Sequence, residues 1–445
     1  MKIHLIAIGG SVMHNLALAL QTNGHDVSGS DDEIYDPARS RLSSKGILPQ
    51  KMGWDSSRIS KSIDAVIVGK HARSDNPELL EAQRLNLKIY SFPSFVAEMS
   101  KEKKRIVIAG SHGKTSTTSI VMHVAKECAI DFDYLVGAQL DGFDNMVRLS
   151  EAPFIIIEGD EYLTSPLDDR PKFLHYNSDA SVITGIAWDH MNVFPTFDFY
   201  VKQFELFIES TVPSSKVYYF SGDQELETIA KKFPAGKMLP YTGFKYQNLK
   251  EGTLVDLGGE KVIIPIFGAH NMQNLEAAFH LCKEMGIGVK AFAQAIKTFK
   301  GPSKRMEQLE EANDCTVYID FAHAPSKVKA TLKAVLERYD KSQVVACLEL
   351  HTYSSLNKDF LPQYFNTLNG AAEAIVLYDP HALKMKNMEE LVKSEVEAAF
   401  GNAVNVFNEP KALHHYLDNM DKKDKVFLMM SSGPWGGINL KDVFK

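Results

Sequence analysis

The chain has 445 residues, more than one hydrophobic core normally covers, so two or three domains are expected. Its formal net charge of −7 provides no basic surface for nucleic acid or an anionic membrane, and no apolar run approaches the roughly 18 residues needed to span a bilayer. The four cysteines are far apart, unlike those of zinc or CxxC redox sites. These features predict a cytoplasmic protein with small-molecule partners, without nucleic-acid or membrane partners.

The first hundred residues alternate short apolar runs with helical ones. A buried strand is predicted at 2–8, a helix at 11–22 and a second strand at 25–31, with a glycine turn after the first strand. Further parallel strands are predicted at 64–69 and 88–92. This order is typical of a small doubly wound α/β domain.

A second segment begins with a lysine-rich connection at 101–105 and an apolar strand that runs to Ile108. Ile108 occupies the position where the usual phosphate-binding pattern has its first glycine, so the loop is short at its entry. The loop residues are Gly110, Ser111, His112, Gly113, Lys114, Thr115 and Ser116. Such loops bind phosphate with backbone N–H groups and a lysine, and magnesium with a hydroxyl. We therefore predict ATP binding, against the alternative of a glycine turn before an ordinary helix.

Acidic side chains follow two predicted strands of the same segment. Glu158 lies at the exit of the strand at 154–158, with Asp160 and Glu161 next to it, and a second strand leads to Asp189 and His190. Magnesium requires hard oxygen ligands, often one or two carboxylates beside the phosphates. Each cluster alone is more often a solvated loop or a structural histidine, but together with the phosphate loop the pattern predicts a magnesium-nucleotide site at the carboxyl edge of one sheet.

Asn271 and Asn274 lie three residues apart at the start of a predicted helix, so they share a face. Carboxamides can pair with the edge of a purine, and helix capping by Asn271 is the structural alternative. A third segment begins near Gly301 and again alternates strands with a helix. Its predicted strands are at 316–320, 343–350, 373–379 and 425–433, and its helix is at 326–339.

Together these motifs resemble the Mur ligase family, the ATP-dependent amide-forming enzymes of peptidoglycan synthesis. The resemblance rests on GSHGKTS at 110–116, EGDE at 158–161, DHM at 189–191, GAHNMQN at 268–274, Arg305 with Glu307, and DFAHAP at 320–325. It implies three α/β domains: a Rossmann-like UDP-sugar domain (1–100), a central P-loop ATPase domain (101–300) and a Rossmann-like acceptor domain (301–445).

The resemblance also implies roles for individual residues. Lys114 would hold the ATP phosphates, and Thr115, Glu158 and His190 would surround Mg²⁺. Asn271 and Asn274 would face adenine. From the third domain, Arg305 and Asp320 would close on the nucleotide.

The N-terminal stretch resembles the branch whose substrate is UDP-N-acetylmuramic acid. By this similarity Gly9, Gly10, Ser11, Ser30 and Asp31 would bind the UDP-sugar, with the glycines near the diphosphate and Asp31 near a ribose hydroxyl. The acceptor would be a murein tripeptide, L-alanyl-γ-D-glutamyl-meso-diaminopimelate, in peptidoglycan recycling. The segment at 168–176, Glu349 and the segment at 430–437 favour this acceptor over L-alanine, whereas the segment at 351–360 partly resembles the alanine-adding branch.

His323, His351 and Lys358 are candidate contacts for the peptide, with a solvated surface as the alternative. In the implied reaction, the lactyl carboxylate of the UDP-sugar attacks the γ-phosphorus of ATP, and an amine attacks the resulting acyl phosphate. A P-loop kinase or a nucleotide-dependent binding switch would share the first motif. Neither explains the motif at 320–325 or the N-terminal domain.

Overall fold

The computed structural model describes all residues except 141, 166–167, 189–192, 310–311, 313 and 402–403. The chain divides into two compact units, each described here by itself. The first comprises Met1–Phe244 and Gln273–Ile296, and the second comprises Lys245–Met272 and Lys297–Lys445. In the described residues, no helix has both the length and the apolar character required to cross a membrane.

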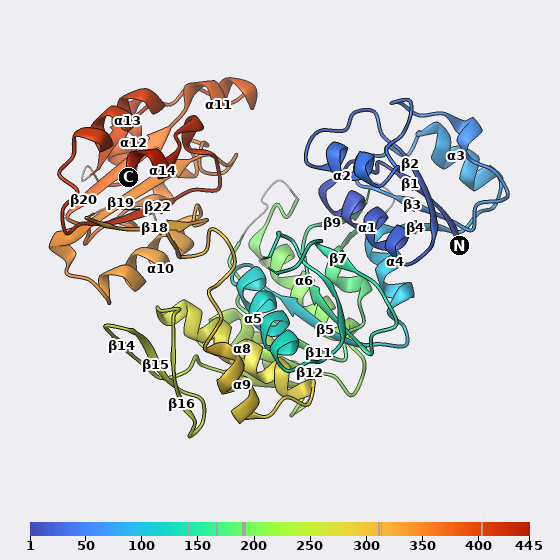
Figure 1. The fold of residues 1–445 in the computed structure, drawn as a ribbon, viewed down its shortest axis with the longest axis horizontal. Helices are drawn as coiled ribbons and strands as arrows, with labels where there is room; N and C mark the ends of the chain where they lie inside the picture. Colours follow the sequence, from blue (N-terminus) through green and yellow to red (C-terminus); the bar gives the residue numbers. More distant parts are fainter. Residues whose placement is uncertain (141, 166–167, 189–192, 310–311, 313, 402–403) are drawn as a thin grey trace. The chain divides into compact units, whose positions relative to one another are not determined.

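The first unit begins with a parallel sheet in the order β2-β1-β3-β4. Its strands are β1 (Lys2–Ile6), β2 (Asp26–Ser30), β3 (Ala65–Val68) and β4 (Ile89–Ser91). All of β3 is buried, as expected for a strand covered on both faces. The accompanying helices are α1 (Ser11–Thr22), α2 (Ala38–Ser44), α3 (Pro77–Arg84) and α4 (Phe92–Met99). The predicted doubly wound arrangement and the helix at 11–22 are confirmed (Figure 1).

A second sheet of the first unit has the order β13-β12-β11-β5-β8-β6-β7. Its strands are β5 (Lys104–Ala109), β6 (Phe132–Leu135), β7 (Val147–Arg148), β8 (Phe154–Glu158), β11 (Ala180–Ile183), β12 (Lys216–Phe220) and β13 (Met238–Tyr241). β5 pairs in parallel with β8 and β11, so that Ile108 is opposite Glu158 and Ala109 is opposite Ile183. The carboxyl ends of three strands therefore meet at one edge, where the candidate site lies.

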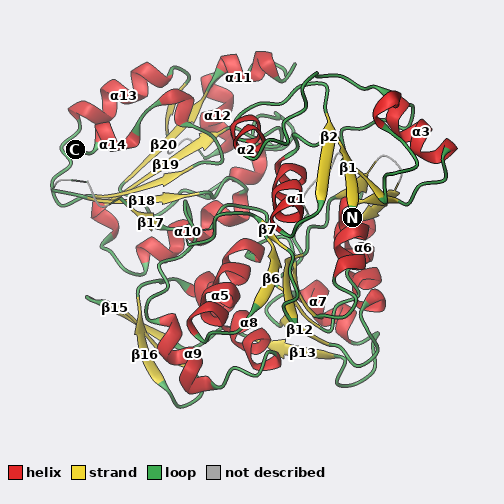
Figure 2. Cartoon of the chain, turned by 45° about the vertical axis from the view of Figure 1, so that its right-hand side comes forward, coloured by secondary structure: helices red, strands yellow, loops and turns green. Residues whose placement is uncertain are grey.

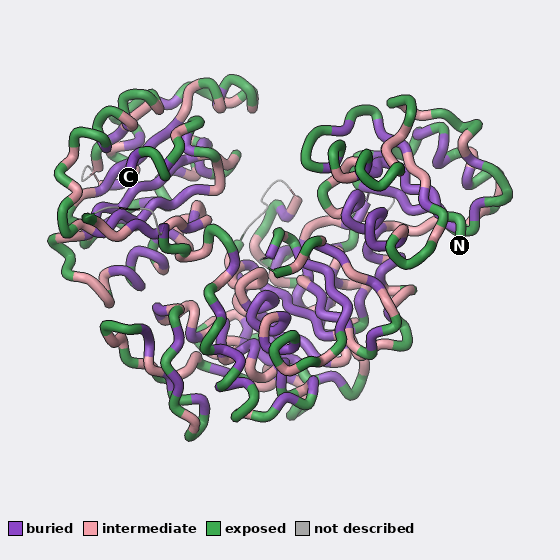
Figure 3. Tube along the Cα trace, in the orientation of Figure 1, coloured by how far each residue is buried: buried purple, intermediate pink, exposed green. Residues whose placement is uncertain are grey.

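Helices and a compact aromatic core support this edge. The helices include α5 (Lys114–Glu127), α6 (Phe197–Ser210), α7 (Gln224–Ala230), α8 (Ala269–Glu284) and α9 (Val289–Ile296). The ring of Phe173 stacks on Phe207 at 4.9 Å between centroids, and Tyr200 on α6 is fully buried beside Phe204. Figures 2 and 3 show strands alternating with helices and the buried strands at the centre of the sheets.

The second unit contains an antiparallel sheet that strand–helix alternation does not predict. It is formed by β14 (Tyr246–Leu249), β15 (Gly252–Asp256) and β16 (Lys261–Ile264). Gly258 and Gly259, both with positive φ, make the turn between β15 and β16. A Gly-Gly pair between two short apolar runs is a hairpin signal, and it is the feature of the sequence that indicates this sheet.

The larger sheet of the second unit has the order β17-β18-β22-β19-β20-β21. Its strands are β17 (Glu307–Gln308), β18 (Thr316–Asp320), β19 (Val344–Leu350), β20 (Glu373–Tyr378), β21 (Asn405–Phe407) and β22 (Val426–Met430). β17 is antiparallel to β18, and the other pairings are parallel. The helices include α10 (Pro325–Leu336), α11 (Pro380–Met385), α12 (Lys393–Ala399), α13 (Pro410–Asn419) and α14 (Leu440–Val443). The predicted α/β class is confirmed in both units.

Candidate active site

The phosphate loop connects the end of β5 to the start of α5 and requires glycine at two positions. Gly110 has φ +125°, and a Cβ there would lie 2.2 Å from Oγ1 of Thr184. Gly113 has φ +81°, and a Cβ there would lie 2.3 Å from Oδ1 of Asn274. Any larger residue would need both a strained backbone and displaced neighbours, so these glycines are explained by the folded loop itself.

The loop is held by the two residues that directly follow the neighbouring strand β11. The Thr184 hydroxyl donates to the carbonyl oxygens of Ala109, at 3.1 Å, and His112. The N–H of Ser111 donates to the carbonyl of Gly185 at 2.9 Å. These bonds determine the loop shape and leave the amino end of α5 as a site for an anion, as the sequence predicts.

Lys114 is the first residue of α5, and its ammonium group is paired within the first unit. Its Nζ lies 2.6 Å from Oε2 of Glu161 and donates to the carbonyl of Gly110 at 2.5 Å. Burial lowers the pKa of Lys114, but the charges of Glu161 and Asp160 outweigh it, so the pKa is raised. Lys114 therefore stays protonated and places a positive charge beside the loop.

Glu161 is 1% exposed, and Tyr200 connects it to the loop from the other side. The Tyr200 hydroxyl donates to Oε1 of Glu161 at 3.4 Å and is hydrogen-bonded to the Ser111 hydroxyl at 2.7 Å. Sequence analysis missed Tyr200, because a tyrosine on the apolar face of a predicted helix has no local signal for a role in a distant loop. Lys114, Glu161, Tyr200 and Ser111 thus form one largely buried polar cluster.

Thr115 and Glu158 bring two hard oxygen groups together at the carboxyl edge of the sheet. The Thr115 hydroxyl donates to Oε1 of Glu158 at 2.9 Å, and the N–H of Gly137 donates to Oε2 at 3.1 Å. Burial raises the pKa of Glu158. A partly buried carboxylate and a hydroxyl beside a phosphate loop fit Mg²⁺, which binds few protein groups and keeps water and phosphate oxygens.

The remaining acid of the EGDE stretch has its own cation. Although burial raises the pKa of Asp160, the ammonium of Lys172, 2.6 Å away, and the charge of Lys114 lower it overall. Asp189 and His190 lie outside the described residues. In the described part of the chain, no group of three or more His, Cys, Asp or Glu side chains could hold a metal ion by itself. Any Mg²⁺ bound here would need ligands from phosphate or water.

A cavity of about 400 Å³ joins the phosphate loop to the N-terminal glycine turn within the first unit. Its lining includes Gly10, Ser11, Lys70, Lys114, Glu158 and Lys172. Lys70 lies over the ring of Tyr162, with its Nζ 3.6 Å from the centroid. A larger cavity of about 960 Å³ in the same unit is lined by none of the predicted site residues, so size alone does not identify the site.

The residues predicted to contact the UDP-sugar differ in where they point. The N–H of Gly9 donates to Oδ2 of Asp31 at 2.7 Å, and a Cβ on Gly9 would lie 2.9 Å from that atom. Gly10 and Ser11 line the cavity. Ser30 is fully buried, and its hydroxyl donates to Glu78 in the interior of the domain. Burial raises the pKa of Asp31 to about 6.

The two asparagines of α8 are engaged differently. The Thr117 hydroxyl donates to Oδ1 of Asn274 at 3.4 Å, which places Asn274 against the phosphate loop. The Asn271 amide donates to the carbonyl of Phe267 at 2.9 Å, and both residues belong to the second unit. Adenine recognition by this pair stays a prediction.

Asp320 organises the end of β18 in the second unit. Its carboxylate accepts from the N–H groups of Met306 at 2.8 Å and Ala322 at 2.7 Å. The Arg305 guanidinium lies 4.7 Å from the ring centroid of Phe321, and Nδ1 of His323 lies 2.9 Å from the Phe321 carbonyl oxygen. A role of Arg305 and Asp320 at the nucleotide stays a prediction.

Glu349 and the segment at 430–437 meet in the second unit. The carboxylate is 2% exposed and accepts from the Ser431 hydroxyl, from the N–H of Trp435 at 2.9 Å and from the N–H of Gly436 at 3.1 Å. Nδ1 of His351 lies 4.0 Å from Oε1 of Glu349. Lys358 pairs with Glu395 at 3.1 Å on the surface. Of the three predicted peptide contacts, His351 is the one beside this buried carboxylate.

Comparisons with known proteins show the family of this chain. The sequence matches the Mur ligase family catalytic domain at residues 2–104, the Mur ligase middle domain at 108–282 and the Mur ligase glutamate ligase domain at 304–433. A UDP-N-acetylmuramate–L-alanyl-γ-D-glutamyl-meso-2,6-diaminoheptandioate ligase of Haemophilus influenzae is 28% identical, with 99% of this chain and 98% of that protein covered. A UDP-N-acetylmuramate–L-alanine ligase of Caldicellulosiruptor bescii is 30% identical, with 87% and 85% covered.

Solved structures share the fold. A murein peptide ligase from Psychrobacter arcticus has a TM-score of 0.65 at 22% identity, with 99% of this chain and 98% of that chain covered. UDP-N-acetylmuramate-alanine ligase MurC from Thermotoga maritima has a TM-score of 0.71 at 22% identity, with 98% and 96% covered. A MurF ligase from Thermotoga maritima with a TM-score of 0.61 was solved in complex with ADP, at 15% identity and with 83% and 86% covered.

Proposed function

This chain belongs to the Mur ligase family, and we propose that it is an ATP-dependent ligase that joins UDP-N-acetylmuramic acid to a murein tripeptide. The bond formed is an amide between the lactyl carboxylate of the sugar and the free amine of L-alanyl-γ-D-glutamyl-meso-diaminopimelate. This reaction would serve peptidoglycan recycling in the cytoplasm. One observation carries the proposal: Lys114, Thr115 and Glu158 meet at the carboxyl ends of adjacent parallel strands, beside the cavity that reaches the N-terminal glycine turn.

ATP is needed because a carboxylate does not condense with an amine in water. Transfer of the γ-phosphoryl group to the lactyl carboxylate gives an acyl phosphate, whose phosphate is a good leaving group. The amine then attacks the acyl carbon, and phosphate departs. No protein nucleophile is required, so binding, orientation and charge neutralisation should dominate catalysis.

The residues at the loop have distinct parts in this proposal. Lys114 would exchange its contact with Glu161 for the ATP phosphates and offset the charge that develops on them. Thr115 and Glu158 would hold Mg²⁺, which neutralises phosphate oxygens when bound. His190, outside the described residues, is proposed as a further ligand from the family resemblance. The partial burial of this edge would restrict the access of water to the acyl phosphate.

The identity of the amine acceptor is a separate part of the proposal. Relatives of similar identity carry both names: the tripeptide ligases of Haemophilus influenzae and Escherichia coli are 28% identical, and several L-alanine ligases are 27–30% identical. The contact of Glu349 with the segment at 430–437 favours the tripeptide, because both features resemble that branch. L-alanine is the alternative acceptor.

Parallel assays distinguish the tripeptide ligase from an L-alanine ligase and from a kinase or binding switch. The protein is incubated with ATP, Mg²⁺ and UDP-N-acetylmuramic acid, and with either the tripeptide or L-alanine, while phosphate and the UDP-linked product are measured. We expect product with the tripeptide. Preference for L-alanine would replace the tripeptide reading, and ATP turnover that does not require the UDP-sugar would favour a kinase or a binding switch. With ¹⁸O in the lactyl carboxylate, one label should appear in the released phosphate.

A further inference from the structure

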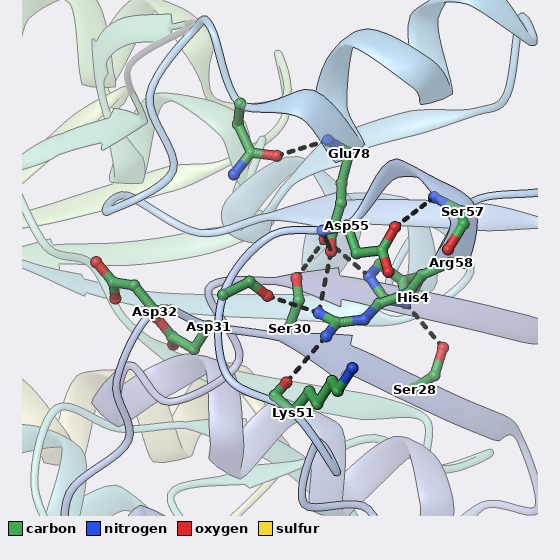
Figure 4. A network of polar contacts seen from close by, with 12 residues as sticks. His4, Ser28, Ser30, Asp31, Asp32, Lys51, Asp55, Ser57, Arg58 and Glu78 are labelled. Atoms are coloured by element: carbon green, nitrogen blue, oxygen red, sulfur yellow. Dashed lines mark hydrogen bonds and ion pairs between the residues drawn. The ribbon is translucent and has the colours of Figure 1, made fainter.

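A buried polar network in the N-terminal domain lies outside the phosphate loop (Figure 4). Its centre is the carboxylate of Glu78 on α3, which is 0% exposed. Nε2 of His4 on β1 lies 3.2 Å from Oε2, and the Ser30 hydroxyl at the end of β2 donates to the same oxygen. Oε1 accepts from the N–H of Asp55 at 2.9 Å and from the Arg58 guanidinium at 3.2 Å.

These contacts keep Glu78 ionised. Burial by itself would raise the pKa of the carboxyl, but the hydrogen bonds from His4, Asp55 and Ser30 outweigh it, and the pKa is lowered. A buried ion pair of this kind is weak evidence for stability, because apolar residues of similar volume often stabilise a fold as well. The specific effect of the network is to hold β1, the end of β2, the segment at 51–58 and α3 in defined positions relative to one another.

One of those segments is the loop at 51–58. The Arg58 guanidinium donates to the carbonyl of Gly53 at 2.7 Å and to that of Lys51 at 2.9 Å. The N–H of Gly53 in turn donates to the backbone carbonyl of Asp31 at 2.7 Å. Glu78 therefore holds Asp31 from two directions, through the preceding residue Ser30 and through the loop.

Asp31 connects this network to the cavity through the glycine turn. Its carboxylate accepts from the N–H of Gly9 at 2.7 Å, and thus ties the glycine turn to the end of β2. Gly10 and Ser11, the next residues of that turn, line the cavity and are among the residues expected to bind the UDP-sugar. Side chains that do not touch a ligand commonly set the geometry of those that do.

We propose that Glu78 is a positioning residue for the UDP-sugar: its carboxylate orders Ser30, the loop at 51–58 and Asp31, and thereby the glycine turn that contacts the substrate. This inference rests on the proposed function. Among the described residues, the side-chain hydrogen bonds and ion pairs of Glu78 involve no residue of the phosphate loop, so ATP binding should depend on Glu78 much less than UDP-sugar binding does. A residue that contributed only to stability would lower the fraction of folded enzyme and leave the Michaelis constants of that fraction unchanged.

The test is Glu78→Gln, which keeps the volume but removes the charge and one acceptor oxygen. Loss of a charged hydrogen-bond acceptor corresponds to about a tenfold effect, so we expect KM for UDP-N-acetylmuramic acid to rise about tenfold. KM for ATP and kcat should change less than about twofold. The matched control is Glu81→Gln on the same helix, whose carboxylate pairs with the exposed Arg84, and we expect it to behave as the unchanged protein.

Binding of UDP-N-acetylmuramic acid without ATP, measured by calorimetry, should weaken by the same factor. An unchanged KM and unchanged binding in folded Glu78→Gln would overturn the inference, as would a parallel rise of KM for ATP. If Glu78→Gln does not fold, Arg58→Gln at the edge of the network carries the test, with a smaller rise expected. Failure of the unchanged protein to use the UDP-sugar would instead refute the proposed function.

Discussion

The ammonium nitrogen of Lys114 lies 2.6 Å from Oε2 of Glu161, so the lysine of the phosphate loop is already neutralised by a buried carboxylate. A nucleotide phosphate bound as proposed would have to compete with Glu161 for this lysine. The fully buried Tyr200 donates to the other oxygen of Glu161 and would keep the carboxylate in place if the lysine turned to a bound phosphate. The loop therefore has an internal anion at the position where a ligand anion is proposed to bind.

Lys114→Ala should remove the main positive charge from the proposed nucleotide site. Loss of such an electrostatic group typically costs about 10²- to 10³-fold in rate, so we expect ADP release to fall to the detection limit. The control is Lys126→Ala, an exposed lysine in the last turn of the same helix. Circular dichroism checks that both variants fold. Normal turnover by Lys114→Ala would refute the assignment of the phosphate loop.

Thr115→Val should change the dependence on magnesium. Valine keeps the shape of threonine but cannot offer the hydroxyl that now donates to Glu158 at 2.9 Å. We expect the Mg²⁺ concentration for half-maximal activity to rise at least about tenfold. Thr115→Ser, which restores the hydroxyl, should return it to near the original value. An unchanged magnesium titration would show that this hydroxyl is not a ligand.

Gly113→Ala and Gly236→Ala separate backbone strain from steric exclusion. Both glycines have left-handed φ, +81° and +85°, so each alanine should cost about 1 kcal/mol of stability. Only at Gly113 would the new methyl meet Oδ1 of Asn274, at 2.3 Å, whereas Gly236 has nothing within 4 Å. We expect kcat/KM for ATP to fall roughly 10- to 100-fold in Gly113→Ala alone. Equal kinetics in the two variants would contradict this.

Asp31 should make stability depend on pH. Burial raises its pKa from the ordinary 3.8 to about 6, so its ionisation opposes folding. This penalty is absent below the unfolded pKa and complete above the folded one, where it amounts to about 3 kcal/mol. Asp31→Asn should therefore gain unfolding free energy relative to the unchanged protein as pH rises from about 4 to about 7.

Urea unfolding of both proteins at several pH values measures this difference. The control is Asp26→Asn, at the exposed first position of β2, the strand that Asp31 directly follows; it removes one carboxylate without relieving a buried one. A difference between Asp31→Asn and the unchanged protein that does not vary with pH would contradict the prediction.

The phosphate loop was predictable because its parts are consecutive in the chain. A buried strand, two glycines, a lysine and a helix form one local unit, and β5 and α5 confirm it. The exit of β8 at Glu158 was predictable for the same reason, since a strand of apolar residues ends where the acids begin. The roles of the predicted site residues toward ligands stay predictions.

Other features had no local signal. The sequence suggested that Ser30 faces a ligand, yet its hydroxyl donates to Glu78, 48 residues further along the chain. The antiparallel sheet β14–β16 interrupts an otherwise regular alternation, and only its Gly-Gly turn indicated it. The partner of a side chain such as Ser30 depends on which elements pack against its strand, and this packing leaves no signal in the neighbouring residues of the sequence.

The amino-acid sequence alone determined the family, the α/β class, the order of strands and helices, and the composition of the phosphate loop, because each follows from apolar periodicity or from residues adjacent in the chain. Tertiary structure decided which charges meet. Lys114 pairs with Glu161, and Arg58 pairs with Glu78. Both ion pairs form only when strand pairing or helix packing brings separate segments of the chain together. Burial then decides whether each group is charged, since the cost of removing a charge from water depends on the partners that the fold supplies.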